Sequence, residues 1–211
     1  MSVTKLTGKF FGLFPSTMMR VRLSAQDSDL NQKLRPVLDG IRKSTPNGLP
    51  KHAASQAYIT RGSGNQLHLR PELTDIVLLV CTEAEAYAEK IMLDMDAGNL
   101  VINACWLTVL EKGEAVEMHT NPSSVFTATY FVNASPKGVQ FRFFSSVGEN
   151  WPHTPSTTAN RVNKRVESIL GLPGELIIFP SNLINDVHGH DDETGHVSLT
   201  FTFDVAPIAP G

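Results

Sequence analysis

The chain has 211 residues, of which 41% are hydrophobic and 18% charged, and its formal net charge is −3. This length can bury a sizeable core, and the apolar content excludes intrinsic disorder. The acidic balance disfavours a nucleic-acid-binding surface, and no apolar run is long enough to cross a membrane. We therefore expect a folded chain with neither nucleic acid nor membrane as partner.

The two cysteines, Cys81 and Cys105, both lie inside apolar runs. This setting is typical of buried thiols rather than of a disulfide framework or a zinc site. The apolar patch Phe10–Phe14 is too short for the core of a signal peptide. Together these features predict a reduced, cytoplasmic protein.

The first third of the chain predicts short extended pieces followed by a helix. Phe10–Pro15 and Met19–Leu23 read as extended segments. Asp27 or Asp29 can cap a helix after them, and Pro36 predicts a kink or a later start. The apolar residues of this helix recur at helical spacing: Leu30, Leu34, Val37, Leu38 and Ile41.

A second, longer helix is predicted after Pro71, a residue that the first helical turn tolerates. Its apolar residues gather on one face, as expected for a helix packed on a core. They are Leu73, Ile76, Val77, Val80, Ala84, Tyr87 and Ile91.

From residue 100 onward the pattern changes to short β-branched and aromatic runs separated by turn residues. The predicted strands are Leu100–Leu110, Val125–Val132, Val139–Phe144, Glu175–Phe179 and Val197–Val205. Gly148–Lys164 is rich in Pro, Ser, Thr and Asn and reads as a long loop, which in compact domains is often a lid or binding loop. We predict an α+β fold in one domain, 1–211, with 1–99 supporting a β core at 100–211.

Polar residues alternate along one extended stretch at Glu117, His119 and Asn121. On a strand these three side chains share a face, so they could form one edge of a metal pocket. The alternative is a solvated polar face on a single strand.

A second polar cluster, 187–196, contains three histidines and three carboxylates. Imidazole together with carboxylate suits Zn, Fe or Mn, and His188 and His190 share a face if this segment is extended. The alternative is a hydrated turn between two strands, since glycine and acidic residues are common in such turns.

Blocks spread over nearly the whole chain resemble the small 2-oxoglutarate/Fe(II)-dependent oxygenase family. These blocks are Leu13–Pro15, Leu67–Leu73, Ile102–Leu107, His119–Val132, Pro173–Ser181 and Val197–Phe201. The resemblance implies a double-stranded β-helix, or jelly roll, with the N-terminal helices packed on the major sheet. It also implies Fe(II) and 2-oxoglutarate as cofactors and hydroxylation of a substrate.

The resemblance assigns metal positions residue by residue. His119 stands at the family's first iron-binding histidine, and Asn121 stands at the ligand position two residues later. Asn185 occupies the position of the distal histidine. His188 would become a ligand if a local bulge turned it inward, and Glu117 could supply a carboxylate.

The resemblance also implies a cosubstrate site. Where the family has an arginine that holds the distal carboxylate of 2-oxoglutarate, this chain has His196, followed by the matching Ser198. Arg142 on a neighbouring strand could replace the arginine if its side chain points inward. Tyr130 completes the predicted set.

Three functions remain open from the sequence. The first is an oxygenase with a rearranged metal site, acting on an unknown small molecule or protein. The second is a catalytically degenerate jelly roll that binds a ligand or partner in the former active-site pocket. The third is a structural or assembly protein, and a homodimer is compatible with all three.

Overall fold

The computed structural model describes residues 16–23, 28–50, 53, 55–95, 98–134, 138–145, 158, 164–188 and 195–207. The predicted extended piece Phe10–Pro15 lies outside these residues, and so does most of the predicted loop Gly148–Lys164. Neither of the described α-helices is long and apolar enough to cross a membrane.

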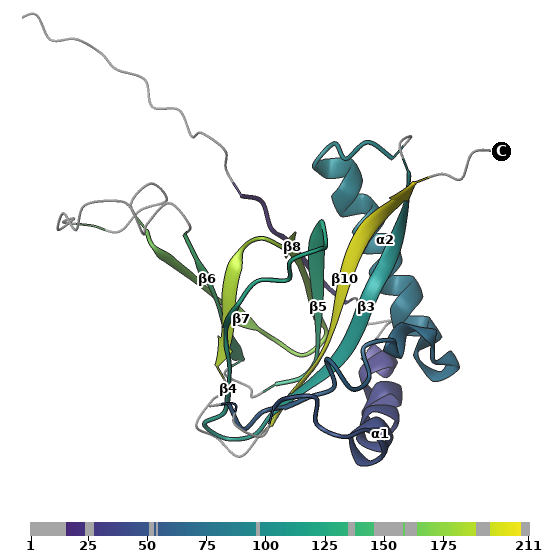
Figure 1. The fold of residues 1–211 in the computed structure, drawn as a ribbon, viewed down its shortest axis with the longest axis vertical. Helices are drawn as coiled ribbons and strands as arrows, with labels where there is room; N and C mark the ends of the chain where they lie inside the picture. The colour runs from purple at the N-terminus through teal and green to yellow at the C-terminus, as the bar shows by residue number, and fades with distance from the viewer. Residues whose placement is uncertain are drawn as a thin grey trace, which may run out of the picture.

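The described strands form two antiparallel sheets that face each other, as a jelly roll requires (Figure 1). The larger sheet consists, in spatial order, of β1 (Met19–Arg22), β8 (Glu175–Pro180), β5 (Phe126–Asn133), β10 (His196–Pro207), β3 (Gly98–Leu110) and β2 (Tyr58–Ile59). The smaller sheet consists of β4 (Ala115–His119), β9 (Ile184–His188), β6 (Val139–Phe144) and β7 (Val166–Gly171).

Strand β10 lies between β5 and β3 and sends alternate side chains to the two faces of the larger sheet. Leu199 and Phe201 pack toward the helices. Ser198 and Thr200 point toward the smaller sheet, where they line a cavity. The hydrophobic side chains of β10 therefore pack against the helix layer, and its hydroxyl side chains face the smaller sheet.

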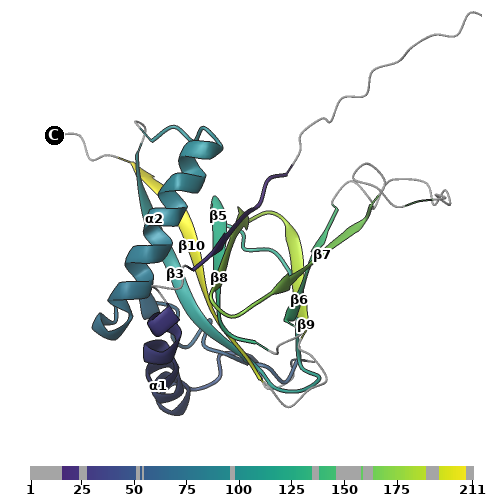
Figure 2. The same ribbon diagram turned by 180° about the vertical axis from the view of Figure 1, so that it is seen from behind.

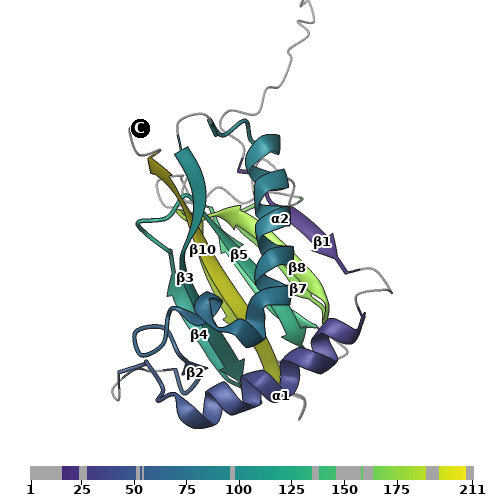
Figure 3. The ribbon, with the colours of Figure 1, turned by 90° about the vertical axis from the view of Figure 1, so that its right-hand side faces the viewer.

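Helices α1 (Ser28–Ser44) and α2 (Thr74–Lys90) cover the outer face of the larger sheet (Figures 2 and 3). Short 3-10 turns at Leu67–Leu69 and Pro71–Leu73 lead into α2. The buried residues of α2 are Ile76, Val80, Ala84, Tyr87 and Ala88, which largely confirms the predicted apolar face.

The predicted late start of the first helix is wrong, because α1 begins at Ser28 and continues through Pro36. An interior proline costs about 3 kcal/mol. Leu34, Leu38 and Ile41 are buried against the sheet, and each contributes about 1.5–3 kcal/mol. Their combined burial outweighs the cost of the proline.

Gly171 at the end of β7 is the basis of a stability prediction. A Cβ added there would lie 2.5 Å from Cζ of Phe131, a fully buried ring. We expect Gly171→Ala to lower the free energy of unfolding by about 1–3 kcal/mol, because the core ring must move. Urea denaturation measures this loss.

The matched control is Gly40→Ala in α1, where an added Cβ meets no atom within 4 Å. Because alanine is the better helix former, this variant is expected to gain up to about 1 kcal/mol. Equal effects of the two substitutions would contradict the packing of β7 against β5.

Candidate functional site

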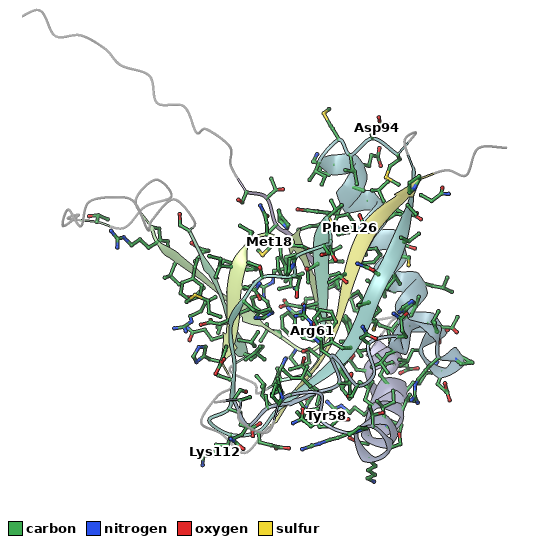
Figure 4. All side chains as sticks on the ribbon, viewed as in Figure 1. Met18, Tyr58, Arg61, Asp94, Lys112 and Phe126 are labelled. Atoms are coloured by element: carbon green, nitrogen blue, oxygen red, sulfur yellow. The ribbon has the colours of Figure 1, made fainter. Side chains whose placement is uncertain are left out.

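A cavity of about 370 Å³ lies between the two sheets. Arg61, which follows β2, is labelled between the sheets in Figure 4. The polar lining residues include Arg61, Thr108, Glu117, His119, Asn121, Thr127, Thr129, Asn185, His196, Ser198 and Thr200, and the aromatic ones are Trp106, Phe131, Phe141 and Phe179.

The larger sheet gives this cavity a floor of hydroxyl groups. Ser198 on β10 is paired with Thr108 on β3, and Thr200 on β10 is paired with Thr129 on β5. The Oγ1 atoms of Thr129 and Thr200 lie 3.3 Å apart. Inward-facing positions of three adjacent strands thus place neutral hydrogen-bonding groups side by side.

His119 ends β4 and is paired with Asn185 on β9. Its Nδ1 lies 2.8 Å from the backbone oxygen of Glu117, so Nδ1 carries the proton and Nε2 the lone pair. Burial lowers the pKa of His119; the contact with Glu117 opposes this, the positive charge of Arg61 adds to it, and Asp186 opposes it. The ring is therefore neutral near pH 7.

Asn121 is 2% exposed, and both ends of its amide are already bound. Arg61 donates from Nη1 to Oδ1 of Asn121 over 2.9 Å. Nδ2 of Asn121 donates to Oγ1 of Thr127 over 3.1 Å, and Thr127 in turn contacts Oγ of Ser181 at 2.7 Å. These contacts fix the amide with its oxygen toward the guanidinium.

Arg61 is a site residue that the sequence prediction missed. Its guanidinium carbon lies 4.9 Å from the centroid of the Trp106 ring, within the range of a cation–π contact. Burial lowers its pKa, but an arginine stays charged. Within the described part of the chain, no carboxylate forms an ion pair with it. The sequence places it in a Gly-Ser loop, which carries no signal of a site.

Asn185 is 1% exposed and bonds to backbone. Its Nδ2 donates to the carbonyl oxygen of Leu183 over 2.9 Å and to that of His119 over 3.4 Å. At this position the side chain therefore ties β9 to β4.

His196 lies at the start of β10 and is 3% exposed. Its Nε2 lies 3.0 Å from Oγ of Ser198. Burial lowers its pKa to about 4, although a backbone contact with Asn133 opposes the shift. The side chain at the position that the resemblance assigns to the family's arginine is thus neutral at pH 7.

The low pKa of His196 predicts a pH-dependent stability. Below pH 6.5 the unfolded chain protonates this histidine, whereas the folded chain does so only near pH 4. The free energy of unfolding should therefore fall by about 3 kcal/mol from pH 7 to pH 4 through this group. In His196→Gln, the free energy of unfolding should not show this part of the fall with pH. Urea denaturation of both proteins at several pH values measures the difference. Parallel pH profiles of the two proteins would contradict the assignment.

The structure contradicts the site roles predicted for His188 and Arg142. Neither lines the cavity, because Asn185 and Val187 face inward on β9 and Asp186 and His188 alternate with them. Arg142 donates from Nε to Oδ1 of Asp186 over 2.8 Å, and its Nη2 contacts Oδ2 of Asp186 and Nε2 of His188. The two predicted residues instead form an ionic cluster on the opposite face of the smaller sheet.

A bulge does occur in the pairing of β4 with β9, but it lies on β4 and not on the strand that carries His188. Val116 is paired with Val187, and His119 with Asn185, so the extra residue lies in β4. The side chains of β9 therefore keep alternating between the two faces of the sheet, and the bulge in β4 lies just before His119.

The cosubstrate role predicted for Tyr130 is also wrong. Tyr130 on β5 belongs to the core cluster beneath the helices. Its hydroxyl donates to Oδ1 of Asn31 in α1 over 2.6 Å. The residues on either side of it, Thr129 and Phe131, are the ones that reach the cavity.

The donors at the positions that the resemblance assigns to the metal do not fit the two-histidine, one-carboxylate set that non-haem iron oxygenases use. The three implied positions supply one imidazole and two neutral amides, from His119, Asn121 and Asn185. Among the residues that the structure describes, no group of three His, Cys, Asp or Glu side chains could hold a metal ion.

Comparison with known proteins confirms the resemblance seen in the sequence. Residues 104–202 match the family described as "Putative 2OG-Fe(II) oxygenase". No curated protein matches the chain.

Solved structures share the fold at low sequence identity. A Pseudomonas putida prolyl-4-hydroxylase is 13% identical, with a TM-score of 0.58 over 90% of this chain and 92% of its own. AviO1 from Streptomyces viridochromogenes Tue57 is 12% identical, with a TM-score of 0.58 over 93% and 92%. The epimerase SnoN, solved with Fe3+, alpha ketoglutarate and nogalamycin RO, is 10% identical, with a TM-score of 0.64 over 90% and 80%.

The predicted fold class is therefore confirmed: this is an α+β chain with the jelly roll of the 2-oxoglutarate/Fe(II) oxygenases. By family match and fold it is an oxygenase-like protein of unknown substrate. Fe(II) and 2-oxoglutarate are the cofactors that this family suggests, and the positions that the sequence resemblance assigns to the metal carry His119, Asn121 and Asn185 in this chain.

Proposed function

We propose that this oxygenase-like chain binds a small molecule in the cavity between its sheets through its own side chains, without an iron ion at the three family positions. The observation that carries the proposal is the hydrogen bond from Arg61 to Asn121. This bond places a fixed positive charge beside the position from which a metal-binding carboxylate would have to act.

Electrostatic repulsion by Arg61 supports a cavity without iron at these positions. A dication roughly 6 Å from a guanidinium, at an effective dielectric constant of 20, is repelled by about 5 kcal/mol. In the family pattern a carboxylate offsets the charge of the metal, but Asn121 is neutral and its oxygen already accepts a bond. Binding a metal there would require breaking this bond and moving Arg61.

A second candidate is an oxygenase in which iron is anchored by His119. The contact between His119 Nδ1 and the carbonyl of Glu117 favours it, because metal-binding histidines commonly donate their other ring nitrogen in this way. The same experiment decides between the two candidates.

The test is an anaerobic titration of metal-free protein with Fe(II) and 2-oxoglutarate, watched for the visible charge-transfer band of a chelated complex. The proposal predicts no band. A band that is lost in His119→Ala and kept in His188→Ala, which alters a histidine outside the cavity, would overturn it and establish the second candidate.

A further inference from the structure

We infer that the cavity selects a small monocarboxylate, with its acid group at Arg61 and its uncharged end at His196 and Ser198. This inference rests on the proposed function and names the ligand class of that same site. It follows from the way charge is distributed along the cavity.

The cationic end is built to receive an acid group. Arg61 is held by Asn121 on one side and lies over Trp106 on the other, so its orientation is fixed before a ligand arrives. One N–H group contacts Asn121, and the fork has further donors for a planar carboxylate. Glu117 also lines the cavity and, like Arg61, is exposed; the two form no ion pair within the described chain.

The side chains that the structure describes at the far end of the cavity are polar but uncharged. Trp106, beneath Arg61, is paired with Thr200, and His196 stands four residues earlier on β10. At the strand rise per residue this separation is about 13 Å. There the side chains of His196, Ser198 and Thr108 offer neutral donors and acceptors.

Among the described residues that line the cavity, Arg61 is the one lysine or arginine, and this argues against a dicarboxylate such as 2-oxoglutarate. A second carboxylate near His196 would be buried beside a neutral imidazole and hydroxyl groups, which is costly without a paired charge. A hydroxyl or amide end would instead be satisfied there. Between the two ends, Trp106, Phe131 and Phe179 suit an apolar middle segment.

The test compares three probes of equal chain length by isothermal titration calorimetry on the full chain. The probes are 6-hydroxyhexanoate, its uncharged analogue 6-hydroxyhexanamide, and the dianion adipate. Wild type is expected to bind the hydroxy acid at least about tenfold more tightly than either of the others. Arg61→Gln should bind the acid and the amide equally, and Arg70→Gln, an exposed arginine outside the cavity, should behave as wild type.

A second variant tests the other end. His196→Arg places a second cation at this end and should shift the preference from the hydroxy acid to adipate by about tenfold. A thermal melt confirms that each variant is folded.

The inference would be overturned by equal affinity of wild type for acid and amide, by tighter binding of adipate, or by an acid preference that survives in Arg61→Gln. Absence of binding by all three probes would also overturn the monocarboxylate assignment. The outcome of the Fe(II) titration does not depend on these binding measurements. A failure of the monocarboxylate inference is therefore distinguishable from a failure of the proposed function.

Discussion

Replacing Asn121 with aspartate and Asn185 with histidine in one protein is expected to create an Fe(II) site that wild type lacks. The double variant completes a set of two imidazoles and one carboxylate around His119, which itself is paired with residue 185 across the β4–β9 ladder. We expect the affinity for Fe(II) to rise at least about a hundredfold. Anaerobic calorimetric titration measures it.

Arg61 is expected to limit the Fe(II) affinity of this double variant. Its guanidinium already bonds to Oδ1 of Asn121, so a carboxylate introduced by Asn121→Asp would form an ion pair with it, and Arg61 would compete with the metal. Adding Arg61→Gln should therefore raise the affinity for Fe(II) further.

The matched control is Asn103→Asp with Asn99→His, which makes the same chemical changes at exposed positions of β3 outside the cavity. It should leave metal affinity at the wild-type level. A folded Asn121→Asp, Asn185→His protein with no gain over this control would contradict the assignment of these two positions.

The largest stability effect is expected from Phe126→Ala. The Phe126 ring is fully buried, stacks on Phe203 with centroids 5.1 Å apart, and meets the edge of Tyr87 of α2 at 5.3 Å. Truncation removes contacts that join the helix layer to two strands, so the free energy of unfolding should fall by about 3–5 kcal/mol. Because domains are stable by only about 5–15 kcal/mol, this is a large fraction of the total.

Urea denaturation of both proteins measures the loss, with Leu78→Ala as control. Leu78 lies on the same helix but is 62% exposed, so its truncation should change stability by less than about 0.5 kcal/mol. A loss below about 1 kcal/mol in Phe126→Ala would contradict the contact between α2 and the sheet.

Much of the fold could be predicted because its elements carry strong local patterns. The helix after Pro71 shows a full apolar face, and the strand predicted at Val139–Phe144 has the same bounds in the structure. Strands β2, β7 and β9 escaped prediction because they acquire their identity by pairing with distant neighbours. Hydrogen bonds between strands, rather than local preference, define such segments.

The candidate site was predictable only in part. His119, Asn121, Asn185, His196 and Ser198, to which the resemblance assigns site roles, all line the cavity, and their roles there stay predictions. His188, Arg142 and Tyr130 do not, because a shift of one residue along a strand reverses the face to which a side chain points. Sequence spacing alone does not reveal on which strand a bulge occurs.

The sequence by itself determined the α+β class, the order of most elements and the chemical identity of each position, including the amides of Asn121 and Asn185 at positions that the resemblance assigns to metal ligands. The tertiary structure decided that Arg61, sixty residues before Asn121 in the chain, bonds to its amide. It also decided that Arg142 and His188 pair with Asp186 outside the cavity. Local patterns depend on neighbouring residues, whereas the charge inside a cavity depends on which distant side chains the packed strands bring together.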